Sequence, residues 1–313
     1  MKNNFNDKSG GDKNNVLVPS VRDKDGTGYD IFSLLLKERI IVVQGQVETA
    51  MAGVIISQLK YLESLDSKAP IRMMINSPGG SVFDGLAIYD VMREVACPIE
   101  TIGNGMQASM GSILLVGGDT RSTTKNSGVL VHQVMGGTEG GTQHSDFEIS
   151  AASMAHLHER LKSIYVEFTG LNHKFWDIVG ERDSWLTAEQ AMKIGFIHGI
   201  VEDHKPGGKY AADAVRSGKD GLQGALNKAS QEYIAKMSAD DIAKAINSAS
   251  AAGGVYARVR GELIVKLAEF PEFWTETKKL EMAAAVKSAN IANDNSGDNG
   301  KPVAKKKRGS APQ

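Results

Sequence analysis

Short apolar segments alternate with amphipathic segments of helical spacing from Val16 to about Lys205. Parallel strands need a crossover connection, usually a helix, so repeated strand-then-helix order favours a parallel sheet covered by helices. The pattern predicts an α/β layered domain. We expect strands at 40–43, 71–75, 98–102 and 128–133, and helices at 48–65, 84–95 and 150–168.

The composition changes after Pro206-Gly207-Gly208, where Ala, Lys and Ser become frequent. Helical stretches are predicted at 231–250, 256–269 and 274–289, and Pro271 separates the last two. The polar ends of the chain predict disorder. The expected organisation is a leader or propeptide at 1–15, a main domain at 16–205, a helical extension at 206–292 and a disordered basic tail at 293–313.

Composition excludes several classes of protein. The formal net charge of -1 favours neither nucleic acid nor a membrane surface, and the short basic cluster Lys305–Arg308 lacks interleaved aromatic residues. The single cysteine, Cys97, excludes a disulfide framework and a multi-cysteine zinc site. The N-terminus has no apolar signal region, and no run reaches the roughly 18 apolar residues of a membrane span. We therefore expect a cytoplasmic protein.

Ser109 lies in the run Met106–Gly111 between small residues, directly before an apolar segment. A nucleophilic serine needs a tight turn, an exposed hydroxyl and backbone amides that can hold an oxyanion. An ordinary turn serine would give the same local pattern. Gln107 also replaces the first glycine of the Gly-x-Ser-x-Gly elbow, so the interpretation depends on partners elsewhere in the chain.

Three further segments supply such partners. His132 follows the apolar run Val129–Val131 and is a candidate base, although a structural core histidine would fit equally well. Asp183 precedes a helix that Thr187 and Gln190 are predicted to cap, and it could orient the base. By spacing alone, Asp146, Asp177 and Glu181 remain alternatives to Asp183.

Two glycines, Gly79 and Gly80, follow a predicted strand and allow close approach of the backbone. Their amides could form an oxyanion hole with the amide of Met110, although a plain strand-to-helix turn would also contain them. No Gly-Lys-Ser/Thr follows, which argues against a phosphate-binding loop. The histidines lack zinc-site spacing, and no metal or cofactor is predicted.

Taken in order, Ser77-Pro78-Gly79-Gly80, Ala108–Gly111, His132-Gln133 and Arg182-Asp183 resemble the proteolytic subunits of the Clp protease family (ClpP). The resemblance covers about residues 16–203. It implies a ClpP/crotonase-like fold, with repeated β-β-α layers and a protruding handle helix that begins near Ser150. It also implies a serine endopeptidase that forms two stacked heptameric rings, a tetradecamer, around a chamber. An AAA+ unfoldase such as ClpX or ClpA would supply unfolded polypeptide.

The resemblance also assigns roles to residues. Ser109 would be the nucleophile, His132 the general base and Asp183 its orienting acid. The amides of Gly80 and Met110 would form the oxyanion hole. The glycine-rich segment with Gly136 and Gly137, at 136–142, would be the strand that pairs with substrate, and Arg182 would contact a neighbouring ring.

The sequence departs from the family pattern at three places. Val134 stands where proline usually follows His-Gln, Arg72 and Met74 replace aromatic residues of the ATPase docking pocket, and the extension after Lys205 is unusually long. A capsid-maturation protease on the same fold is therefore an alternative. A crotonase-like acyl-CoA enzyme and a non-catalytic ring subunit are the others.

Overall fold

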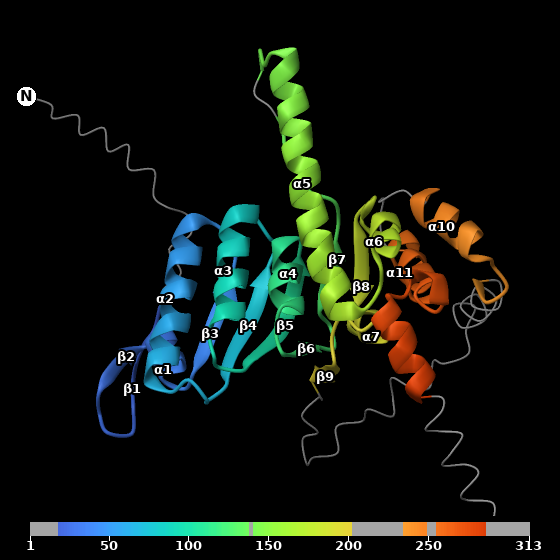
Figure 1. Cartoon of the computed structure of the whole chain (residues 1–313). Helices are drawn as coiled ribbons and strands as arrows, with labels where there is room; N and C mark the ends of the chain where they lie inside the picture. The colour runs from blue at the N-terminus through green and yellow to red at the C-terminus, as the bar shows by residue number, and fades with distance from the viewer. Residues whose placement is uncertain (1–17, 138–139, 202–233, 249–254, 286–313) are drawn as a thin grey trace, which may run out of the picture. The chain divides into compact units, whose positions relative to one another are not determined.

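The computed structural model describes residues 18–137, 140–201, 234–248 and 255–285 (Figure 1). The predicted leader, the Pro206–Gly208 break and the basic tail with Lys305–Arg308 lie outside these residues. The chain forms two compact units, Met1–Val129 with His198–Glu202, and Leu130–Ile197 with Asp203–Gln313. The domain division expected at residue 205 stays a prediction.

A parallel sheet forms the centre of the first unit, in the strand order β3-β4-β5-β6-β9. Consecutive strands from β3 to β6 are connected by single helices, as the alternation predicts. The strands are β3 (Ile40–Gln44), β4 (Ile71–Ser77), β5 (Ile99–Ala108), β6 (Thr120–Thr124) and β9 (Gly199–Val201). The helices are α2 (Thr49–Leu65), α3 (Val82–Glu94) and α4 (Met110–Val116).

The buried face of the sheet follows the two-residue period of its strands. In β4, Ile71, Met73 and Ile75 are fully buried, whereas Arg72 and Asn76 point to the other face and are exposed. The helices cover the buried face with Leu59, Leu62, Ile88 and Met92. Each such apolar side chain contributes roughly 1.5–3 kcal/mol on burial, so this layer contains the core of the unit.

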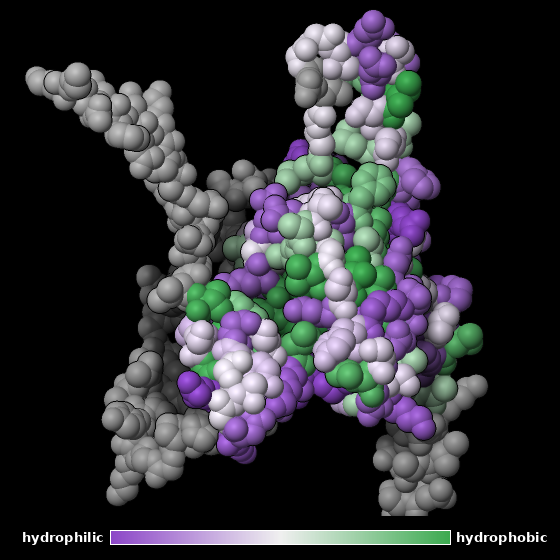
Figure 2. Space-filling view, turned by 90° about the vertical axis from the view of Figure 1, so that its left-hand side faces the viewer, coloured by the Kyte–Doolittle hydropathy of each residue, from purple (hydrophilic) through white to green (hydrophobic). Residues whose placement is uncertain are grey.

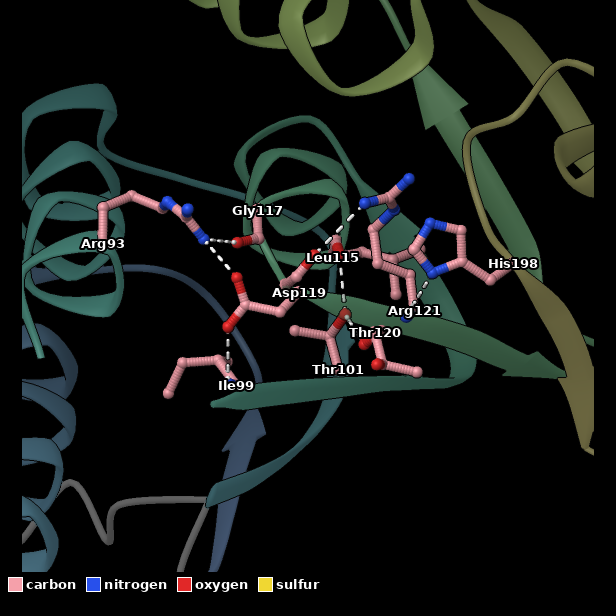
Figure 3. A network of polar contacts seen from close by, with 10 residues as sticks. Arg93, Ile99, Thr101, Leu115, Gly117, Asp119, Thr120, Arg121 and His198 are labelled. Carbon is pink, nitrogen blue, oxygen red and sulfur yellow. Dashed lines mark hydrogen bonds and ion pairs between the residues drawn. The ribbon is translucent and has the colours of Figure 1, made fainter. Parts of the chain in front are cut away.

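A polar network fixes the connection between α4 and β6 (Figure 3). The Asp119 carboxylate accepts hydrogen bonds from the Ile99 amide at 2.8 Å and from Arg93 at 2.9 Å. The Arg121 amide donates to Nδ1 of His198 at 3.3 Å. Burial and the nearby Arg121 lower the pKa of His198, which keeps its ring neutral and able to accept this bond.

Ahead of the sheet, the first unit carries a hairpin and a short helix. These are β1 (Ser20–Arg22), β2 (Gly28–Asp30) and α1 (Ile31–Lys37), and the Asp30 carboxylate caps α1 by accepting from the amides of Phe32 and Ser33.

The second unit contains α5 (His144–Thr169), α6 (His173–Gly180), β8 (Ser184–Thr187) and α7 (Ala188–Lys193). β7 (Gly128–Val131) ends in this unit and pairs with β8. Thr187 and Gln190 form the predicted capping box. The 26 residues of α5 span about 39 Å, and its buried residues all lie in its C-terminal part, from Lys162 onward.

Described parts of the extension pack on this unit. They comprise α10 (Ala239–Ser248), α11 (Val255–Leu267), a 3-10 helix η1 (Pro271–Phe273) and a helix at 276–285. Asn172 donates from its amide to the Phe273 carbonyl and from Nδ2 to the Glu272 carbonyl, both at 2.7 Å. The rings of Phe175 and Phe273 meet edge to face. The predicted helix breaker Pro271 is the first residue of η1.

Several predictions need correction. β7 ends at Val131, so His132 follows the strand instead of lying on it. The predicted substrate-pairing strand is not formed at Gly136, Gly137 or 140–142. These residues are exposed or half-buried, and none of them pairs with another strand in the described chain. Helix α5 begins at His144, before the predicted Ser150. The sequence pattern does not reveal its first turns, because they are solvent-exposed and form no apolar stripe.

A membrane-spanning helix, which would have to be both long and apolar, does not occur in the part of the chain that the structure describes.

Arg39 gives a test of this fold. It has a left-handed backbone with φ of 61°, and its guanidinium donates to the carbonyls of Leu62, Asp66, Ala69 and Pro70 at 2.9–3.1 Å. These bonds tie the start of β3 to the end of α2 and to the connection that leads into β4. Arg39→Gly keeps the backbone unstrained, so the expected loss of about 2 kcal/mol in the free energy of unfolding measures the guanidinium bonds.

Urea denaturation measures this loss. The exposed Lys37→Ala is the control and should leave the free energy of unfolding unchanged within error. Equal stability of Arg39→Gly and the unsubstituted chain would show that the guanidinium bonds contribute nothing.

Candidate active site

Ser109 occupies a strained turn between β5 and α4. Its φ of 53° and ψ of -123° lie outside the regions that residues with side chains favour, and among described non-glycine residues only Arg39 shares a positive φ. Such strain costs of the order of 1–3 kcal/mol and persists only when the surroundings enforce it. Here β5 precedes the turn and every residue of α4 is buried. The side chain of Ser109 itself is half-buried and thus reachable.

The Gly79 backbone packs directly against this turn. A Cβ on Gly79 would lie 2.5 Å from Cβ of Ser109, 2.7 Å from the Ala108 carbonyl oxygen and 2.9 Å from the Met110 nitrogen. Its φ of +88° also requires glycine. The structure therefore brings the Ser-Pro-Gly-Gly segment and Ser109 together.

The amides of Gly80 and Met110 are the predicted oxyanion donors. The Gly79 carbonyl accepts from the Val47 amide at 2.8 Å, and the Ser81 amide donates to the Val47 carbonyl at 2.9 Å. In a parallel bridge the intervening residue directs its own N–H to the other side, so the Gly80 amide points away from Val47. The Met110 amide is among the first of α4 and has no intrahelical acceptor.

Buried polar side chains hold this turn in place. The Ser77 hydroxyl donates to the Gly45 carbonyl at 2.7 Å and accepts from the Gly79 amide at 3.1 Å. Gln107 donates from Nε2 to the Ile75 carbonyl at 2.9 Å, joining β5 to β4 just before Ser109. Neither supporting role has a local pattern in the sequence, because both depend on backbone groups more than 30 residues away.

In the second unit, His132 and Asp183 line one open pocket of about 510 Å³. The pocket also contains Gly136, Met154, Gly180 and Arg182. Gln133 connects its two sides, because its amide donates to the Gly180 carbonyl at 2.8 Å and its side chain to the Glu181 carbonyl at 3.1 Å. Gly137 is exposed and is not among the lining residues.

His132 has a defined hydrogen-bond partner. Its Nδ1 lies 2.6 Å from the Gln133 carbonyl oxygen, to which a protonated Nδ1 donates. This tautomer leaves Nε2 with a free lone pair, which is the state that a general base requires. In this conformation the Gln133 carbonyl, and not the Asp183 carboxylate, is the partner of Nδ1.

The alternative acids differ in their surroundings. Asp177 forms an ion pair with the buried Lys162, and Asp146 lies in the first turn of α5. Glu181 lines the same pocket as Asp183, with an oxygen 3.9 Å from Nη1 of Arg182. Position thus favours Glu181 and Asp183 over the other two.

A second histidine lies behind the pocket. Cε1 of His158, on α5, is 4.0 Å from the position that a Cβ on Gly180 would take. Burial lowers the pKa of His158, and the positive charge of Lys162 lowers it further. His158 is therefore neutral near pH 7 and adds no cation beside His132. No cluster of three or more metal-ligand side chains occurs in the part of the chain that the structure describes.

Comparison with known proteins identifies the family. Residues 23–204 match the family model for Clp protease. The chain belongs to the Clp protease family. A curated relative from Salinibacter ruber (strain DSM 13855 / M31), the "ATP-dependent Clp protease proteolytic subunit 1", is 44% identical over 192 residues, which is 60% of this chain and 82% of the relative. The protein is accordingly a serine-type peptidase, and its parallel sheet and helices agree with the ClpP fold.

The Gly79–Ser109 contact generates a testable prediction. In Gly79→Ala the new methyl group would overlap the turn, so we expect Ser109 to react with a fluorophosphonate at least about 100-fold more slowly. The rate of covalent labelling, followed by intact-protein mass, measures the effect.

Gly26→Ala is the matched control. Gly26 has a similar φ of +86°, but a Cβ there would meet nothing within 4 Å. It imposes the same kind of backbone strain without the contact and should label at the unsubstituted rate. Equal labelling of both variants would contradict a role for the Gly79 approach.

Proposed function

We propose that the chain is a serine endopeptidase in which Ser109, His132 and Asp183 form the catalytic triad. The observation that carries this proposal is the strained Ser109 turn packed against Gly79. Such a turn presents the hydroxyl while keeping backbone amides within reach of the same carbonyl. The pocket shared by His132 and Asp183 supports the other two roles.

In the proposed reaction, Oγ of Ser109 attacks the peptide carbonyl while Nε2 of His132 accepts the hydroxyl proton. The amides of Gly80 and Met110 donate to the developing oxyanion. His132 then protonates the leaving amine, and water hydrolyses the acyl-enzyme by the same route. For Asp183 to stabilise the imidazolium, Nδ1 of His132 must exchange the Gln133 carbonyl for the Asp183 carboxylate.

Substrate would bind in extended form along the segment with Gly136 and Gly137. Main-chain hydrogen bonds to an added strand bind a polypeptide largely without reading its side chains. In the described state, a Cβ on Gly136 would lie 2.6 Å from Sδ of Met154, so the backbone lies close against α5. Because this segment forms no strand in the described state, we expect it to become extended and to pair with the substrate when the substrate binds.

We further propose the double heptameric ring and its closed chamber. Exposed apolar side chains that lie together support subunit contacts, because contiguous apolar patches mark interaction surfaces, and Val54 and Tyr61 line one groove along α2. Phe147 and Ile149 are 52% and 68% exposed near the start of α5, and Val54 and Tyr61 are 56% and 53% exposed on α2. Figure 2 shows apolar residues interspersed with polar ones on one face.

An AAA+ unfoldase is the proposed partner and the cytoplasm the proposed location. The partner is in keeping with the name of the ATP-dependent relative from Salinibacter ruber. Arg72 forms an ion pair with Glu100 at 2.9 Å, where the family pattern has an aromatic residue. A charged, paired side chain offers a hydrophobic docking loop less apolar surface than an aromatic ring. We infer that any ATPase contact in this chain differs at Arg72.

Ser109→Ala tests the chemistry. Loss of the nucleophile should lower kcat for peptide cleavage by about 10⁴–10⁶-fold and abolish fluorophosphonate labelling. Ser112→Ala, in the first turn of α4, is the control, because it removes a hydroxyl that donates to the Ser109 carbonyl at 2.7 Å and leaves the Ser109 hydroxyl in place. Cleavage by Ser109→Ala at the unsubstituted rate would refute the triad.

Native mass spectrometry of the full chain tests the assembly. The proposal expects fourteen-subunit particles, and a monomer under conditions that support cleavage would contradict it. Co-purification separates the two partner hypotheses, since an AAA+ ATPase supports the one proposed here and a capsid protein would replace it with capsid maturation.

A further inference from the structure

Arg260, on helix α11 of the C-terminal extension, holds the segment that carries Asp183. We call residues 179–184 the acid loop. The Arg260 side chain is buried, with the residue 3% exposed. Its Nε donates to Oγ of Ser184 at 2.9 Å, and its Nη2 to the carbonyls of Val179 at 3.4 Å and Arg182 at 3.3 Å.

These bonds reach both chain neighbours of Asp183. Arg182 precedes it and Ser184 follows it, and the Ser184 hydroxyl also lies 2.5 Å from the Val179 carbonyl oxygen. The guanidinium is planar and presents its donors in a fixed fork, so the three loop acceptors are held in one geometry. A shift of the loop would break several of these bonds together.

The acid loop places an opposite charge near Arg260. Burial lowers the pKa of Arg260, the negative charge of Asp183 raises it, and the positive charge of Arg182 lowers it. A buried cation is tolerated only when acceptors and opposite charge surround it. The Ile246 carbonyl of α10 accepts from Nη1, so two helices of the extension contribute to this environment.

The next residue along α11 fixes how the helix docks. A Cβ on Gly261 would lie 2.3 Å from Oε1 of Gln190, the capping-box residue of α7. Ile264 and Leu267 are fully buried further along the helix. Because α7 begins directly after β8, the helix that carries Arg260 is anchored to the chain on the C-terminal side of the acid loop.

We propose that Arg260 is a positioning residue, through which the C-terminal extension holds Asp183 in the geometry that His132 needs. This inference rests on the proposed triad and deepens it. It gives the extension a role in the peptidase reaction itself.

Arg260→Met tests the inference in the full-length chain, with a peptide substrate and with an activated ester. Misplacement of a reacting group by about 1 Å can cost about 100-fold, so we expect kcat to fall by about 10–100-fold. KM should change less than about twofold, because Arg260 does not line the pocket. Arg260→Lys keeps the charge without the fork and should recover part of the loss. Equal kcat for Arg260→Met and the unsubstituted chain would overturn the inference.

Leu267→Ala is the control for stability. It removes a fully buried side chain of the same helix, seven residues beyond Arg260, and leaves the Arg260 hydrogen bonds in place, and thermal unfolding is measured for each variant. We expect Leu267→Ala to lower the melting temperature with little change in kcat at temperatures where it is folded. An equal loss of kcat in Leu267→Ala and Arg260→Met would mean that general destabilisation explains the effect. If Arg260→Met does not fold, Arg260→Lys decides, and a folded Arg260→Lys with full kcat contradicts the inference.

A double-substitution cycle isolates the route of action. In an Asp183→Asn background, Arg260→Met should lower kcat for the activated ester by less than about threefold, because the group that it positions is already lost. A loss equal to that in the unsubstituted background would overturn the inference. If the unsubstituted chain neither cleaves substrate nor labels at Ser109, the proposed function fails. If it is active and only the cycle is additive, the inference alone fails.

Discussion

The contact between the Gly79 backbone and the Ser109 turn constrains the rest of the first unit. A methyl group on Gly79 would lie 2.5 Å from Cβ of Ser109, so the two segments can meet only as bare backbone. β4 and β5 run parallel with Ser77 opposite Gln107, which brings the two segments together, and α4 turns into the core directly afterwards. The buried Ser77 and Gln107 side chains maintain this alignment by hydrogen bonds to backbone groups. The strain at Ser109 is sustained because moving the turn would disturb all of these contacts.

Periodicity in the sequence predicts the elements that bury a regular apolar face. β3, β4, α2 and α3 were expected within a few residues of their ends. β6 was missed because its sequence, Thr-Arg-Ser-Thr-Thr, is polar, and its strand conformation comes from pairing with β5 and β9. The first turns of α5 gave no helical pattern, because their two large apolar residues, Phe147 and Ile149, are two positions apart and do not share a face. A local sequence pattern does not report which strands pair in the folded protein, nor which helical turns remain exposed to solvent.

The same distinction between local patterns and tertiary contacts applies to the residues of the candidate site. The sequence pointed to the Ser109 turn and to Gly80 because the roles proposed for them depend on local backbone geometry, which glycine and small neighbours reveal. Spacing in the sequence does not distinguish Asp183 from Glu181 as the acid that orients the base, and in the structure both residues line the same pocket. Arg260 gave no signal at all. Its acceptors are the Ser184 hydroxyl, 76 residues away along the chain, and backbone carbonyls, which every sequence possesses.

The burial of Arg260 has a consequence for how the extension relates to the peptidase fold. A guanidinium removed from water is costly unless its donors are satisfied, and here the acid loop provides most of the acceptors. The extension therefore depends on the acid loop for its own stability, just as the loop depends on the extension for its position. Phe273 on Phe175 and the paired Asn172 hydrogen bonds add a second point of attachment. The described part of the extension therefore belongs to the same folded unit as the acid loop. Separating them would leave the buried Arg260 guanidinium without most of its acceptors and would remove its hydrogen bonds to the acid loop.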